Sequence, residues 1–209
     1  MQLNQYNRLT AEFYQREDTV EIAKALLGQL LVTEFDGQRT VGRIVETEAY
    51  KAPEDQACHA YLNRNTKRTK TMFLPGGVAY IYLCYGIHHL FNVVTGPAGC
   101  AHAVLVRAVE PVEGIKHMLA RRGHAKVKRN LTAGPGILSQ ALGLRKQYDA
   151  ISLIAPGSPI YLAAAPSVDE AQIVACPRIG IDYAGESVDW PWRFYERESK
   201  WVSKYYKIS

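Results

Sequence analysis

The stretch that decides the fold is R-I-V-E-T-E-A-Y, from Arg43 to Tyr50, and V-A-Y-I-Y-L-C follows it at residues 78–84. Residues 40–50 are predicted to form a strand. Asp36-Gly37 just before it is a hairpin turn signal, so residues 29–35 are predicted to be its antiparallel partner. Two long strands joined by a tight turn favour a sheet built from hairpins.

The second stretch begins another predicted hairpin. Residues 78–84 and 88–94 read as its strands, with a tight turn at Tyr85-Gly86. The apolar run at residues 102–109 predicts a further, buried strand. Outside the strands, residues 51–71 are polar and irregular, and helices are predicted over residues 18–28, 111–122 and 134–143. These elements predict one α+β domain over residues 1–209. Its curved, mainly antiparallel sheet is flanked by short helices and carries a protruding β-hairpin.

The composition predicts a globular protein with an anionic partner. Of the 209 residues, 47% are hydrophobic and 22% are charged, and the net charge is +5, which favours an anionic partner such as nucleic acid or a membrane surface. No apolar run reaches the length of a membrane span, and Met1–Gln5 do not begin a signal peptide, so a cytoplasmic protein is expected. The four cysteines form no Cys-x-x-Cys pair, so we expect free thiols and no zinc site.

A pair of carboxylates stands in the first stretch. Side chains alternate along a strand, so Glu46, Glu48 and Tyr50 are expected on one face. On their own, two such glutamates are more often solvent-facing residues of an edge strand. Arg107 favours the other interpretation, because a guanidinium within an apolar strand is costly to bury unless an anion meets it. We therefore expect Arg107 to contact Glu46 or Glu48.

Aromatic residues suggest a site that holds a flat ring. Tyr80 and Tyr82 should share a strand face, whereas Tyr85 at the hairpin tip is placed to enter a duplex as a wedge. Taken singly, Tyr50, His59 and Tyr82 are more often core aromatics, and Tyr85 an ordinary turn residue. Four cations in the irregular segment are either phosphate contacts or a solvated surface run: Arg64, Lys67, Arg68 and Lys70.

Taken together, these stretches resemble a known family. The segment from Arg43 to His59 (RIVETEAYKAPEDQACH) resembles the alkyladenine (3-methyladenine) DNA glycosylases of mammals and many bacteria. The likeness continues in order through MFLPGGVAYIYLCYGIHHLFNVV, VLVRAVEP, AGPGILSQALG, RIGI and RFYERESKWVS, which begin at residues 72, 104, 133, 178 and 193. It therefore covers nearly the whole chain.

The resemblance implies a monofunctional base-excision enzyme that flips a damaged purine out of DNA and hydrolyses its N-glycosidic bond. The implied substrates are 3-methyladenine and 7-methylguanine, with hypoxanthine or ethenoadenine as further candidates. It implies that the protein acts on double-stranded DNA that contains damaged purines. We expect a monomer, the default for an enzyme that must scan DNA, and no cofactor, metal ion or membrane partner. Such a protein lies in the cytoplasm on the bacterial nucleoid, or in the nucleus of a eukaryote.

The resemblance also assigns roles to residues. Glu48 matches the general base that activates water, and Arg107 the arginine beside that water. A base pocket matches Tyr50, His59 and Tyr82, with the carbonyl of Ile179 as a further water contact. Asn92 matches the residue that opposes the 2-amino group of guanine. Tyr85 matches the intercalating residue.

Two other functions stay open at this point. A metal-dependent nuclease would use carboxylates such as Glu46, Glu48 and Asp55, and would be inhibited by EDTA. A non-catalytic binder of distorted DNA or structured RNA would need only the wedge and the basic loops. Release of a free base separates both from a glycosylase.

Overall fold

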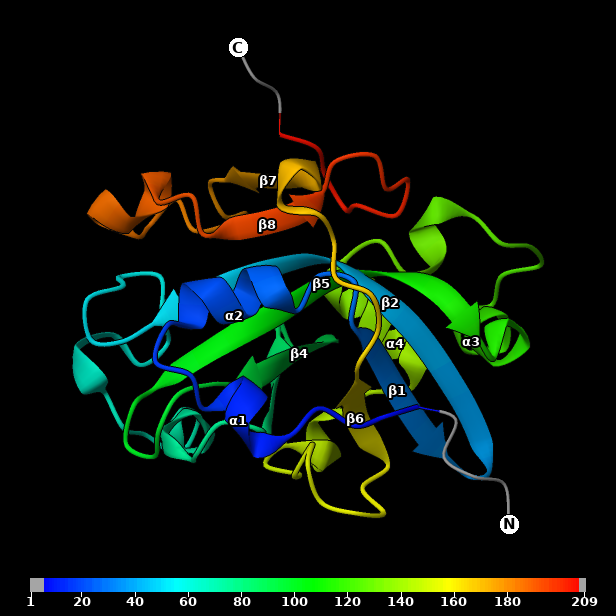
Figure 1. Ribbon diagram of the computed structural model, residues 1–209, viewed down its shortest axis with the longest axis horizontal. Coiled ribbons are helices and arrows are strands. Elements are labelled where there is room, and N and C mark those ends of the chain that lie inside the picture. The colour runs from blue at the N-terminus through cyan, green and yellow to red at the C-terminus, as the bar shows by residue number, and fades with distance from the viewer. Residues whose placement is uncertain (1–5, 207–209) are drawn as a thin grey trace.

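The computed structural model describes residues 6–206, so Met1–Gln5, on which the signal-peptide prediction rests, lie outside the described residues. Within that range the chain forms an eight-stranded antiparallel sheet (Figure 1). Its strands are β1 Leu30–Phe35, β2 Gln38–Lys51, β3 Ala79–Cys84, β4 His88–Val94, β5 His102–Glu113, β6 Ile160–Ala163, β7 Ile173–Cys176 and β8 Arg193–Glu196. The predicted α+β fold with one antiparallel sheet and short helices is confirmed.

Strand β2 is the centre of the sheet. The order is β3-β4-β5-β2-β1-β6, and β8 joins β2 and β7. Along one edge β2 pairs with β5 over nearly its whole length. Along the other edge it pairs first with β1 and then, at Glu46–Glu48, with β8. The long curved ribbon of β2 is visible in Figure 1. Because both edges are occupied, Glu46 and Glu48 cannot be edge-strand residues in solvent, and both are fully buried.

Short helices pack against this sheet. They are α1 Ala11–Tyr14, α2 Thr19–Ala25, α3 Ile115–Arg122 and α4 Pro135–Leu142, with single turns of 3₁₀ helix in the loops. Helix α2 packs on β2 and β5, and α4 on β4 and β5. Asp18 caps α2 by accepting hydrogen bonds from the amides of Val20 and Glu21. Thr47, between the two glutamates, points the other way and donates to the carbonyl of Ala23 in α2. The glutamates therefore face away from α2.

The prediction of a helix over residues 111–122 is wrong at its start. Strand β5 continues to Glu113, because Pro111 pairs with Gly42 at a register shift and Glu113 pairs with Val41. Proline has no amide hydrogen and is tolerated at such irregular positions. Helix α3 begins only after Gly114, whose φ of 72° breaks the strand.

The hairpin of β3 and β4 ends in a strained turn. The amide of Ile87 donates to the carbonyl of Cys84, and Tyr85 and Gly86 between them have φ values of 51° and 74°. A tyrosine in the left-handed region costs roughly 1 kcal/mol.

Among the helices of residues 6–206, none has both the length and the apolar character that a membrane span requires.

Candidate active site

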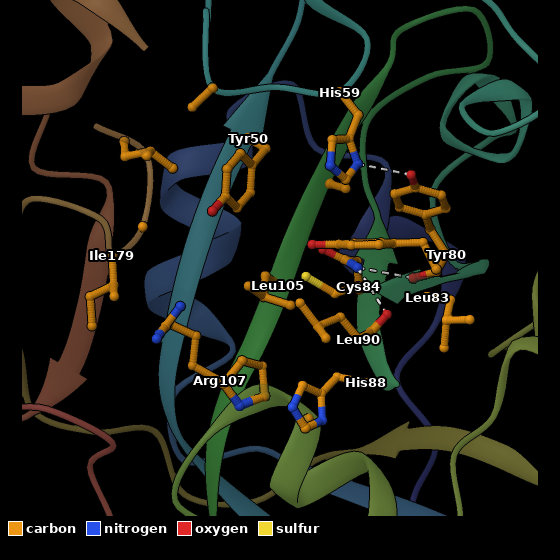
Figure 2. A pocket seen from close by; sticks show the side chains of 18 of the residues that line it. Tyr50, His59, Tyr80, Leu83, Cys84, His88, Leu90, Leu105, Arg107 and Ile179 are labelled. Atoms are coloured by element: carbon orange, nitrogen blue, oxygen red, sulfur yellow. Dashed lines mark hydrogen bonds between the residues drawn. The ribbon is translucent and has the colours of Figure 1, made fainter. Parts of the chain in front are cut away.

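One cavity of about 630 Å³ opens between the end of β2, the β3–β4 hairpin and the start of α4. Its walls include eight of the candidate site residues named from the sequence: Tyr50, His59, Arg68, Tyr82, Tyr85, Asn92, Arg107 and Ile179. Figure 2 shows Tyr50 and Ile179 on one side of the cavity, His59 and Tyr80 on the other, and Arg107 at the lower end. The structure therefore gathers these residues from four separate parts of the chain.

Glu48 lies directly behind this wall. One of its carboxylate oxygens accepts from the amide of Ile179 at 2.8 Å. The other accepts from the Tyr50 hydroxyl at 2.8 Å and contacts the Arg107 guanidinium at 3.1 Å. All three partners line the cavity, whereas Glu48 has no exposed surface. Ile179 reaches Glu48 through its N–H, while the sequence suggested a role for its carbonyl.

A second buried carboxylate fixes Arg107. Glu46 accepts from Nε of Arg107 at 3.0 Å and from Arg193 at 2.8 Å. It also accepts from the amide and the hydroxyl of Ser203. The expected contact between Arg107 and a glutamate is thus present with both Glu46 and Glu48, and the two carboxylates are balanced by two guanidinium groups. These anions raise the pKa of Arg107 even though burial lowers it.

Tyr50 is held from behind by a pair that the sequence did not predict. The Arg178 guanidinium lies 4.8 Å from the centre of the Tyr50 ring, and it is paired with the buried carboxylate of Asp55. Burial, and then the Glu48 charge, raise the pKa of the Tyr50 hydroxyl, so this group is a hydrogen-bond donor at neutral pH. Arg178 covers one face of the Tyr50 ring, so the other face remains for contact with the cavity.

The opposite wall is aromatic. His59 lies edge-on to Tyr82 with 4.6 Å between ring centres, and its Nδ1 is 3.0 Å from the Tyr80 hydroxyl. Its Nε2 is 3.1 Å from Arg68, which can only donate, so Nε2 accepts and Nδ1 carries the hydrogen. Burial, followed by the charge of Arg68, lowers the pKa of His59 from 6.5 to about 4. His59 is therefore neutral at pH 7.

Arg68 itself lies in the cavity. Its guanidinium is 5.0 Å from the centre of the Tyr82 ring, in addition to its contact with His59. All four cations of that run are exposed, but Arg64, Lys67 and Lys70 do not line the cavity. Arg68 therefore differs from its neighbours in its contact with the cavity. The sequence could not predict this difference, because the segment is irregular and has no periodicity.

Asn92, on β4, is a polar residue of the cavity wall. Its amide nitrogen donates to the backbone carbonyls of Tyr80 at 3.1 Å and Leu90 at 3.3 Å. Both amide hydrogens are used in this way, so the side-chain carbonyl is its remaining polar group. The residue is buried and lines the cavity, so that oxygen can meet the edge of a ring placed there.

The hairpin tip stands beside the cavity mouth. Tyr85 is 91% exposed and Ile87 is 71% exposed, and Leu83 adds a third exposed apolar side chain. Tyr85 also lines the cavity rim. Large apolar groups gathered at an exposed tip indicate a surface made to contact something.

Residues 6–206 hold no cluster of three or more side chains suited to bind a metal ion. Asp55, considered above as a metal ligand, is instead taken up by Arg178, to which it is paired through both carboxylate oxygens. The carboxylates of Glu46 and Glu48 are likewise engaged by arginines. The donors required for a metal-dependent nuclease are therefore already used.

Comparison with known proteins agrees with this geometry. A family model described as methylpurine-DNA glycosylase matches residues 12–200. The chain belongs to the methylpurine-DNA glycosylase family. This membership makes it a DNA glycosylase of DNA repair and confirms the resemblance seen in the sequence.

Curated relatives agree over almost their whole length. A protein of Chlamydia abortus is 50% identical over 187 residues, which is 89% of this chain and 96% of the relative. A protein of Bacillus cytotoxicus is 46% identical, over 92% of this chain and 97% of the relative. A protein of Natranaerobius thermophilus is 45% identical, over 94% of this chain and 98% of the relative. All three are named "Putative 3-methyladenine DNA glycosylase".

Proposed function

We propose that the protein removes alkylated purines such as 3-methyladenine and 7-methylguanine from double-stranded DNA, using a water activated by Glu48. The observation that carries this proposal is the position of Glu48 directly behind Tyr50, Arg107 and Ile179 at the floor of an aromatic cavity. Glu48 does not itself line the cavity, so the water is placed against the Tyr50 hydroxyl and the Arg107 guanidinium, and Tyr50 links it to the carboxylate. General-base help of this kind is worth about 10²–10⁴-fold in rate.

The cavity walls suit an everted purine. Tyr50 on one side and Tyr82 with His59 on the other supply aromatic surface, and stacking contributes about 1–3 kcal/mol per base. A purine alkylated at N3 or N7 is cationic and gains further from an aromatic face. It is also a good leaving group, so the enzyme mainly has to place the water and stabilise the positive sugar. Asn92 and neutral His59 offer polar atoms to the base edge.

Arg68 must leave its place on Tyr82 for a cationic base to stack there. Like charges in one cavity repel, and the side chain of Arg68 is long and exposed. Once displaced, it can join Arg64, Lys67 and Lys70 at the phosphates of the DNA. Tyr85 fills the gap that the everted nucleotide leaves, because it is the most exposed large apolar side chain at the tip.

The deciding experiment measures release of free base. The protein, in EDTA, is incubated with a duplex carrying one 7-methylguanine, and free base is expected to accumulate with the strand left intact. Binding without release would favour a non-catalytic binder of distorted DNA, and strand cuts that EDTA abolishes would favour a nuclease.

Glu48→Gln tests the mechanism. This variant is expected to bind an abasic duplex normally but to lose single-turnover excision by about 10²–10⁴-fold. Glu110→Gln is the matched control, because Glu110 belongs to the same sheet but is 42% exposed. Wild-type excision by Glu48→Gln would remove Glu48 from the proposed role.

A further inference from the structure

A second cavity of about 430 Å³ lies next to the first, at the other flank of the hairpin tip. His88 and Gly136 line both cavities, so the two are neighbours across a shared wall. Tyr85 belongs to the rim of the first cavity and Ile87 to the second. Nothing in the proposed excision chemistry uses the second cavity.

Two guanidinium groups line it without a carboxylate partner. Arg121, near the end of α3, donates to the carbonyl of Ala141 at 3.1 Å, and Arg145 is exposed at the cavity rim. Neither forms an ion pair within residues 6–206. Burial, and next the charge of Arg145, lower the pKa of Arg121, although the charge of Asp36 acts in the opposite direction. The two arginines therefore repel each other across this cavity.

Neutral donors complete the wall. The Ser139 hydroxyl is buried and has no hydrogen-bond partner among the described residues, although a buried hydroxyl normally has one. His89 accepts the amide of Lys146 at Nδ1, so its neutral ring carries the hydrogen on Nε2. Burial, and next the charge of Arg145, lower the pKa of His89, which keeps the ring neutral. The cavity thus holds positive charge, free donors and a hydroxyl in need of a partner.

We propose that this second cavity binds a backbone phosphate of the DNA next to the everted nucleotide. The inference rests on the proposed function, since it places the everted base in the first cavity and its neighbouring phosphate across the hairpin tip. A phosphate accepts hydrogen bonds only and carries the negative charge that relieves two adjacent guanidinium groups. Its bound oxygens would supply the partner that Ser139 lacks.

The test measures binding, which does not require excision. The affinity for a duplex containing a stable abasic analogue is recorded at several salt concentrations for the wild type, Arg145→Gln and the control Lys116→Gln. The Arg145 side chain makes no hydrogen bond among the described residues, and its backbone carbonyl, which accepts from the Tyr148 amide, is kept in the variant, so the replacement should leave the fold intact. Losing one phosphate contact lowers the slope of log affinity against log salt by about 0.9 and the affinity about tenfold. Lys116, on the same helix as Arg121, is exposed and does not line the cavity.

Ser139→Ala tests the proposed hydrogen bond to the phosphate separately from the charge of Arg145. This variant should fold at least as stably as the wild type, because the hydroxyl is unpaired in the free protein, yet bind the duplex about three- to tenfold more weakly with an unchanged salt slope. Wild-type affinity in Ser139→Ala would remove that residue from the site. A salt slope in Arg145→Gln equal to that of Lys116→Gln would overturn the proposal. Failure of the wild type to release a base would instead refute the glycosylase mechanism. The salt dependence of binding would still test the second cavity, because binding does not require excision.

Discussion

The floor of the active-site cavity and the tip of the β3–β4 hairpin reverse the usual distribution of side chains. At the floor, charged groups are fully buried: Glu46, Glu48, Arg107 and Arg193 lie at or below 8% side-chain exposure. At the tip, large apolar groups are exposed, with Tyr85 at 91%. Each arrangement costs stability by itself, because buried charges lose hydration and an exposed tip buries little apolar surface.

The two regions are held in different ways. Every carboxylate oxygen of the floor has at least one partner, and most partners come from distant parts of the chain. The tip is held by a single turn hydrogen bond and by the pairing of its own two strands. The comparison suggests that the floor is rigid and already arranged for chemistry. The tip, held by few contacts, can instead exchange its contacts with solvent for contacts with DNA when DNA binds.

The largest effect is expected from the floor. Glu46→Ala leaves Arg107 and Arg193 without their shared anion and frees the amide of Ser203, so we expect a loss of about 3–5 kcal/mol in the free energy of unfolding. Urea denaturation measures it. Glu110→Ala, on the same sheet but exposed, should change stability by less than about 0.5 kcal/mol. Equal effects of the two substitutions would show that the buried network does not hold the floor.

An intermediate effect is expected at His59, which lies between the two regions. Its pKa is lowered in the folded protein to about 4, below the usual 6.5, so between these values the unfolded chain binds a proton that the folded chain does not. Folding stability is therefore retained above pH 6.5 and falls as the pH drops toward 4. The loss attributable to His59 is about 1–3 kcal/mol.

Comparison with His59→Gln isolates that contribution. The free energy of unfolding is measured in urea at pH 7 and pH 5 for both proteins. Other groups, including the buried His102, titrate in both proteins and cancel in the difference. The wild type should lose more stability than His59→Gln over this interval. An identical pH dependence would mean that His59 is not shielded from protons in the folded state.

The sequence predicted the tip better than the floor. Tyr85-Gly86 between two apolar runs is a local signal, and the exposed hairpin follows from it directly. The pairing of Arg107 with a glutamate was also predictable, because a cation in an apolar strand needs an anion. The remaining partners were not, since Arg193 and Ser203 lie about 150 residues from Glu46 and share no local pattern with it.

Two other features show the same limit. The position of Arg68 against Tyr82 depends on the path of an irregular segment, which has no periodicity to read. The continuation of β5 through Pro111 depends on a register shift opposite Gly42, whereas proline followed by an apolar-periodic run looks like the start of a helix. Tertiary pairing decided both outcomes.

The smallest effect is expected at the tip, and its sign is opposite to that at the floor. Tyr85 has a φ of 51°, a conformation that asparagine adopts at lower cost, so Tyr85→Asn should raise the free energy of unfolding by about 1 kcal/mol or less. Tyr206→Asn, at an exposed tyrosine without positive φ, should not stabilise the protein. Urea denaturation of both variants gives the stabilities, and binding to a duplex with one 7-methylguanine gives the function. Weaker lesion binding together with higher stability in Tyr85→Asn would identify the turn strain as a cost retained for DNA binding. Lower stability in that variant would show instead that the Tyr85 ring supports the hairpin, and the contrast between floor and tip would then be lost.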